Sequence, residues 1–121
     1  MTIYRDPGCG CCEEWAERAR DAGFKVAVID NSDMPAVKRQ HGVPEELNSC
    51  HTTLVGGYVV EGHVPLDAVK RLLKDRPAGI RGIAVAGMPR GAPGMEMPDG
   101  SKDPFEVMAF DAAGRISAFA A

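Results

Sequence analysis

The chain has 121 residues, of which 45% are hydrophobic, and its formal net charge is −3 at pH 7. This length predicts one domain with its own core, and the composition excludes a wholly disordered chain. The sequence lacks the Lys/Arg cluster of a nucleic-acid-binding protein. It also lacks the roughly 20-residue apolar run that a membrane-spanning helix needs.

Strands and helices are predicted to alternate in the first half of the chain. Residues 2–6 alternate apolar and polar side chains, which is typical of a short strand. A Pro/Gly turn then leads into a helix that ends at Gly23. Residues 24–30 predict a second strand because they carry β-branched side chains. A second short helix follows, capped by Ser32 or Asp33.

A β-hairpin and a third helix are predicted next. Residues 52–65 contain two apolar, β-branched runs on either side of Gly56–Gly57, a dipeptide suited to a tight hairpin turn. The third helix follows from Pro65, has an apolar face, and ends near Pro77.

The remainder of the chain has a different composition. Residues 79–104 are rich in Gly, Pro and Met, which predicts a loop or an extended arm without regular structure. Residues 105–120 predict two further strands around a turn. The order β-α-β-α-β-β-α is that of a thioredoxin fold. We therefore predict one α/β, thioredoxin-like domain over residues 1–121, with its core in 1–77 and the arm and terminal hairpin in 78–121.

Three of the four cysteines form the motif "CGCC" at residues 9–12. In a thioredoxin fold a CxxC pair lies at the start of the first helix, and Cys9 and Cys12 have that spacing. The helix terminus stabilises the thiolate, which attacks disulfides and binds metals. Cys11 is not needed for a redox pair. It is either a small buried residue or a ligand, since a soft cation such as Cu(I) relieves the repulsion among three close thiolates.

The fourth cysteine, Cys50, is followed by His51. In a thioredoxin fold the segment before the third strand passes beside the CxxC pair, so both side chains are predicted to approach the cluster. Cysteine and histidine together are ligands for copper or zinc. A surface polar position is the alternative for His51. Thr52 and Thr53 stand where ordinary thioredoxins have a cis-proline, and the missing ring leaves room for a metal ion.

Three segments in order, "CGCC", "SCHTTLVGGYVVEGHVP" and "GIAVAGMPRGAPGME", resemble a family of small thioredoxin-like bacterial proteins of originally unknown function. This family includes the copper-resistance protein CopG, and the resemblance extends from Ile3 to about Met108. It implies copper handling in the bacterial envelope, with other envelope proteins as partners. It also implies a multinuclear, cysteine-bridged copper cluster and cycling between Cu(I) and Cu(II). The ligands that it implies are Cys9, Cys11, Cys12 and Cys50.

Two further residues are candidate ligands. His63 lies in the second resembling segment, where it either faces the site or stabilises a turn at the end of a strand. Met88 lies in the arm with Met95 and Met97, and thioether sulfur binds Cu(I). The alternative for these methionines is packing of the arm onto the core, which we prefer for Met95 and Met97.

The leading hypothesis is a periplasmic copper-binding protein of bacterial copper resistance. Its predicted ligands are Cys9, Cys11, Cys12, Cys50, His51, His63 and Met88. A thiol–disulfide oxidoreductase, in which Cys9 attacks and Cys12 resolves, is the alternative, and a copper oxidoreductase combines the two. A structural zinc site is disfavoured by the open, soft ligand set. Residues 1–6 lack a signal-peptide pattern, which leaves both an exported mature form and a cytoplasmic protein open.

Overall fold

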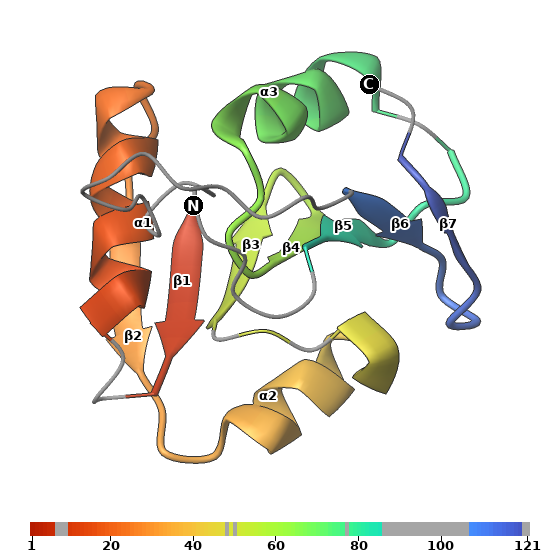
Figure 1. Cartoon of the computed structure of the whole chain (residues 1–121), viewed down its shortest axis with the longest axis horizontal. Helices are drawn as coiled ribbons and strands as arrows, with labels where there is room; N and C mark the ends of the chain where they lie inside the picture. The colour runs from red at the N-terminus through yellow and green to blue at the C-terminus, as the bar shows by residue number, and fades with distance from the viewer. Residues whose placement is uncertain (7–9, 48, 50, 77, 86–106, 120–121) are drawn as a thin grey trace, which may run out of the picture.

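A mixed β-sheet of seven strands, flanked by three α-helices, makes up the described part of the chain (Figure 1). The computed structural model describes residues 1–6, 10–47, 49, 51–76, 78–85 and 107–119, with only the backbone for residues 10–12 and 46. In chain order the elements are β1 (Thr2–Arg5), α1 (Gly10–Asp21), β2 (Ala27–Asp30), α2 (Met34–Gln40), the 3-10 helix η1 (Glu45–Leu47), β3 (His51–Val55), β4 (Tyr58–Glu61), α3 (Leu66–Asp75), β5 (Gly82–Ala84), β6 (Met108–Phe110) and β7 (Ile116–Ala118).

The strand order in the sheet is β2-β1-β3-β4-β5-β6-β7. β1 and β2 are parallel and are joined through α1, because parallel neighbours need a crossover connection. β3 runs antiparallel to both β1 and β4. The first four strands with α1, α2 and α3 therefore have the predicted thioredoxin-like arrangement, and the predicted fold class is confirmed.

Local sequence signals end and cap several of these elements as expected. The Asp33 side chain caps α2 by accepting a hydrogen bond from the backbone N–H of Ala36 at 3.3 Å. Gly56 and Gly57, with φ of 58° and 87°, make the two-residue turn between β3 and β4. This turn needs left-handed backbone at both positions, which glycine adopts without strain.

β5 was not expected, because residues 79–104 were predicted to lack regular structure. Three of them, Gly82–Ala84, pair in parallel with β4 and antiparallel with β6, so that β5 joins the terminal hairpin to the rest of the sheet. All three residues are buried, and three residues are too few to show an alternating pattern. Gly82 is required here, since a Cβ atom at this position would overlap the Val59 carbonyl of β4. The division into a core of 1–77 and an arm of 78–121 stays a prediction.

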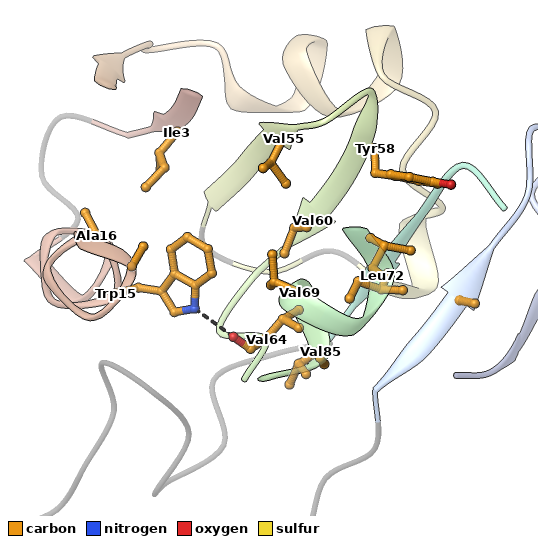
Figure 2. Close-up of a cluster of buried hydrophobic side chains, with 14 residues drawn as sticks. Ile3, Trp15, Ala16, Val55, Tyr58, Val60, Val64, Val69, Leu72 and Val85 are labelled. Carbon is orange, nitrogen blue, oxygen red and sulfur yellow. Dashed lines mark hydrogen bonds between the residues drawn. The ribbon is translucent and has the colours of Figure 1, made fainter. Parts of the chain in front are cut away.

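The larger hydrophobic cluster lies between the sheet and the helices α1 and α3 (Figure 2). Trp15 of α1 is fully buried in it, and its indole N–H donates a hydrogen bond to the carbonyl of Val64 at 3.0 Å. Val69 and Leu72 contribute from α3, and Val60 from β4. Trp15 thus connects α1 with the segment between β4 and α3, as a core anchor should.

A smaller cluster lies on the opposite face of the sheet. Its members are Val43, Leu47, Val59, Ala84 and Phe110. Neighbouring strand residues such as Val59 and Val60 belong to different clusters because side chains alternate between the two faces of a strand. Figure 1 shows α2 apart from α1 and α3.

Candidate functional site

Several strand ends meet at one edge of the sheet. β1 ends at Arg5, and its antiparallel partner β3 begins opposite it, at His51. β4 ends at Glu61, which pairs with Thr52 on one side and with Ala84 on the other. The cysteine motif follows β1 by a few residues in the sequence, and its last two residues, Cys11 and Cys12, lie in the first turn of α1. This edge therefore adjoins, in sequence, both segments that carry predicted ligands.

Two of the predicted ligands, His51 and His63, are buried together at this edge. Both side chains are fully buried, their ring centroids are 5.0 Å apart, and the rings meet edge to face at 87°. The ring of Trp15 lies 5.0 Å from that of His51 on another side. The alternative of a surface position for His51 is therefore wrong, and His63 lies beside it.

Burial keeps the imidazole of His51 neutral. Loss of hydration disfavours the charged form and lowers the pKa of His51 from 6.5 to about 3, with smaller contributions from His63 and from the ammonium group of Lys38. A neutral imidazole has a nitrogen lone pair that can bind a metal ion. The environment of His51 therefore favours the form in which histidine acts as a ligand.

A buried ionic cluster lies on the other face of the same edge, and sequence reasoning missed it. Glu61 of β4 is fully buried, and its carboxylate forms an ion pair with the ammonium of Lys38 on α2. The carboxylate also accepts hydrogen bonds from the Thr52 hydroxyl, at 2.6 Å, and from the backbone N–H of Ser49, at 2.8 Å. We call these four groups the Glu61 cluster. One signal in the sequence was a glutamate in an otherwise apolar strand, "YVVE".

A second set of ion pairs braces the start of α1. The Arg5 guanidinium, at the end of β1, contacts Glu13 in the first turn of α1 at 3.2 Å and Asp30 at the end of β2 at 2.8 Å. The hydrogen bond to Asp30 raises the pKa of Arg5 above its usual value. Because these pairs are partly exposed, they orient the helix start more than they stabilise the fold.

The cysteine side chains themselves are not described. Cys11 and Cys12 lie in the first turn of α1, as predicted, and the structure gives their backbone alone. Cys9, Cys50 and Met88 lie outside the described residues. Among the residues that are described, no three His, Cys, Asp or Glu side chains form a group suited to a metal ion. The convergence of the thiols therefore stays a prediction.

Two solved structures resemble this fold over nearly its whole length. Both are described as copper resistance protein CopG, in forms 1 and 2, with TM-scores of 0.89 and 0.90 and sequence identities of 42% and 41%. The alignments cover 97% of this chain and 91% and 92% of those chains. This chain belongs to the CopG family. No curated protein matches it in sequence.

A family model described as "Protein of unknown function, DUF411" matches residues 47–95 of this CopG-family chain. The matched part contains the β3–β4 hairpin, α3 and β5, and with them Cys50, His51 and His63. The family resemblance seen in the sequence is thus confirmed. Helices that are apolar and long enough to cross a membrane are not found in the described ranges.

The turn after β4 fits its surroundings so closely that only glycine is tolerated at residue 62. Gly62 has φ of +79°, and a Cβ atom there would lie 2.5 Å from Oγ of Ser49 and 2.6 Å from the carbonyl oxygen of Val85. We expect Gly62→Ala to lower the free energy of unfolding by about 2–3 kcal/mol, from left-handed strain plus steric overlap. Urea unfolding measures this difference.

Gly114→Ala is the matched control. Gly114 has φ of +82°, but a Cβ atom there would meet nothing within 4 Å, so this variant reports the strain alone, about 1–2 kcal/mol. Equal losses in the two variants would contradict a tight contact between residues 49 and 62.

Proposed function

We propose that this protein binds copper, as Cu(I), in bacterial copper resistance, and that thiolates supply most of the ligands. Its membership of the CopG family supports this role, since both solved neighbours are copper resistance proteins by description. The ligands that we propose are Cys9, Cys11, Cys12 and Cys50, with His51, His63 and Met88 as further ligands.

The pairing of Arg5 with His51 is the observation that carries the proposal. The cysteine motif follows Arg5 closely along the chain, and Cys50 directly precedes His51. Two segments that are some 40 residues apart in sequence therefore come to the same edge of the sheet. This arrangement supports a single site that draws thiolates from both segments.

The chemistry of the donor set favours copper over zinc. Thiolate and thioether sulfur are soft ligands that suit Cu(I), whereas a structural zinc site is closed and four-coordinate. The neutral imidazole of His51 adds a nitrogen donor at the same edge. Sulfur atoms that bridge two metal ions would accommodate a multinuclear cluster, and such a cluster would allow copper to cycle between Cu(I) and Cu(II).

Anaerobic titration with Cu(I) tests the proposal. We expect Cys11→Ser and Cys50→Ser each to lower the bound copper and to weaken its affinity by more than the roughly 10- to 100-fold that loss of an outer-shell partner costs, because a direct ligand is removed. Competition with a chromophoric Cu(I) chelator measures the affinity. Ser117→Ala, on the exposed edge strand β7, is the control. Parental copper binding in both cysteine variants would overturn the proposal.

Thiol–disulfide exchange is the second candidate function. It is favoured by the thioredoxin-like fold, in which Cys12 lies in the first turn of α1 and Cys9 just before that helix. In this reaction the thiolate of Cys9 attacks a substrate disulfide, and Cys12 then releases the mixed disulfide by forming the internal one. An insulin-reduction assay tests this second function. Unchanged activity in Cys9→Ser would exclude thiol–disulfide exchange through Cys9.

The periplasm is the compartment that we propose, with copper-handling proteins of the envelope as partners. The copper resistance role of the solved neighbours is compatible with this compartment. Fractionation of the bacterial cells that naturally make the protein tests this proposal. Recovery of the protein in the cytoplasmic fraction alone would contradict a periplasmic location.

A further inference from the structure

The Glu61 cluster includes a hydrogen bond to the backbone of Ser49, the residue just before the proposed ligand Cys50. Oε2 of Glu61 accepts the backbone N–H of Ser49 at 2.8 Å as well as the ammonium of Lys38. Oε1 accepts the Thr52 hydroxyl at 2.6 Å, and Thr52 in turn accepts a hydrogen bond from Lys38 at 3.1 Å. The carboxylate is thus bonded on both oxygens, and one of its donors is the backbone immediately before Cys50.

Burying an ion pair in a protein core carries a desolvation penalty. Removing a carboxylate and an ammonium from water costs free energy that their attraction recovers only in part, and well-packed apolar residues of similar volume often stabilise a fold as well or better. An apolar side chain at position 61 would fill the space, but it would not accept the Ser49 N–H. The carboxylate therefore provides a strong, directed hydrogen bond that apolar packing cannot provide.

The residue after Cys50 is held independently. The carbonyl of His51 accepts a hydrogen bond from the N–H of Gly62 at 2.9 Å, and His51 pairs with Arg5 across the sheet. The imidazole of His51 projects to the opposite face from Glu61, where it packs against Trp15. Ser49 and His51 are thus held by different contacts, and Glu61 supplies a hydrogen bond to the backbone of Ser49.

We propose that Glu61, paired with Lys38, is a positioning residue that fixes the backbone of Ser49 and thereby constrains the chain leading into Cys50, one of the proposed copper ligands. This inference rests on the proposed function where it concerns copper, but the anchoring of Ser49 is independent of any metal. Glu61 touches no metal in this role. It acts through the backbone N–H of Ser49, the residue before Cys50.

Two double variants test the hydrogen bonds that the side chain at position 61 accepts from Ser49 and Thr52. Lys38→Met/Glu61→Gln and Lys38→Met/Glu61→Leu both remove the buried charges and keep the side-chain volumes close to the original. Glutamine keeps a carbonyl oxygen that accepts the Ser49 N–H, whereas leucine has no acceptor. We expect both to fold, because charge is removed from the two partners together. Single Glu61→Leu is avoided, since it would leave the ammonium of Lys38 buried and unpaired.

Measurements on the metal-free protein come first. We expect the amide of Ser49 to exchange with solvent at least tenfold faster in the leucine variant than in the glutamine variant. In a background of Cys9→Ser, Cys11→Ser and Cys12→Ser, the alkylation rate of Cys50 should change in the leucine variant and stay near parental in the glutamine variant. Equal exchange and equal alkylation in the two variants would overturn the proposal.

Copper binding is measured in the same two variants with all four cysteines present. We expect the leucine variant to bind Cu(I) about 10- to 100-fold more weakly than the glutamine variant, as for other outer-shell partners, and its thiolate-to-copper absorption to be altered. Global stability should not fall in parallel, which separates positioning from a merely structural role. If copper binding fails in the parent but the Ser49 exchange behaves as expected, the proposed function is wrong and the positioning role stands.

Discussion

Trp15→Ala is expected to lower the free energy of unfolding by about 3–5 kcal/mol, the range found when a buried tryptophan or phenylalanine is truncated. The side chain is fully buried between α1 and the sheet, and its N–H donates to the carbonyl of Val64 at 3.0 Å. Truncation would leave a cavity and an unpaired carbonyl in the same place. Urea unfolding followed by far-UV circular dichroism measures the loss.

Trp15→Phe is the matched variant, because it keeps most of the apolar volume and removes the N–H donor. We expect it to cost about 1–3 kcal/mol, mainly from the unsatisfied Val64 carbonyl. The same tryptophan packs on the ring of His51, so the phenylalanine variant should also show a shifted imidazole resonance for His51. A loss below about 1 kcal/mol for Trp15→Ala would contradict the role of Trp15 as the core anchor of α1.

Much of the fold is predictable because its signals are local. α2 carries its own cap at Asp33, and the β3–β4 hairpin carries its turn in Gly56–Gly57. β5 has no such signal. Its three residues are held in the sheet by pairing with β4 and β6, which lie more than 20 residues away on either side. Tertiary pairing, rather than local propensity, makes this strand, so reading the chain locally assigns it to the arm.

The same distinction between local signals and tertiary contacts applies to the candidate site. Cys11, Cys50 and His51 were singled out because their side chains have distinctive chemistry whatever the fold. Lys38 and Glu61 were not, since such residues almost always face solvent. Their pairing links α2 to β4 across 23 residues, and it depends on which side of α2 faces the sheet. The family resemblance implies ligands, but it does not indicate which buried groups hold the segments that carry them.

The metal-free protein is expected to lose stability as the pH falls below 6.5, and His51 is the main reason. Above pH 6.5 the imidazole is neutral in both the folded and the unfolded chain. Below it the unfolded chain binds a proton that the folded protein does not accept until the pH reaches about 3. The free energy of unfolding should therefore fall by about 1.4 kcal/mol per pH unit, on the order of 5 kcal/mol over the whole window.

His51→Leu tests this linkage, with His41→Leu as the control. Leucine fills a similar volume and cannot bind a proton. The slope of unfolding free energy against pH between 4 and 6 should therefore be smaller than in the parent by the contribution of one proton, about 1.4 kcal/mol per pH unit. His41 lies at the partly exposed end of α2, so His41→Leu removes a histidine that does not share the burial of His51. The groups that act electrostatically on His51 are His63 and Lys38, and both remain in each variant. Parallel slopes in the parent and in His51→Leu would mean that this imidazole is protonated in the folded protein.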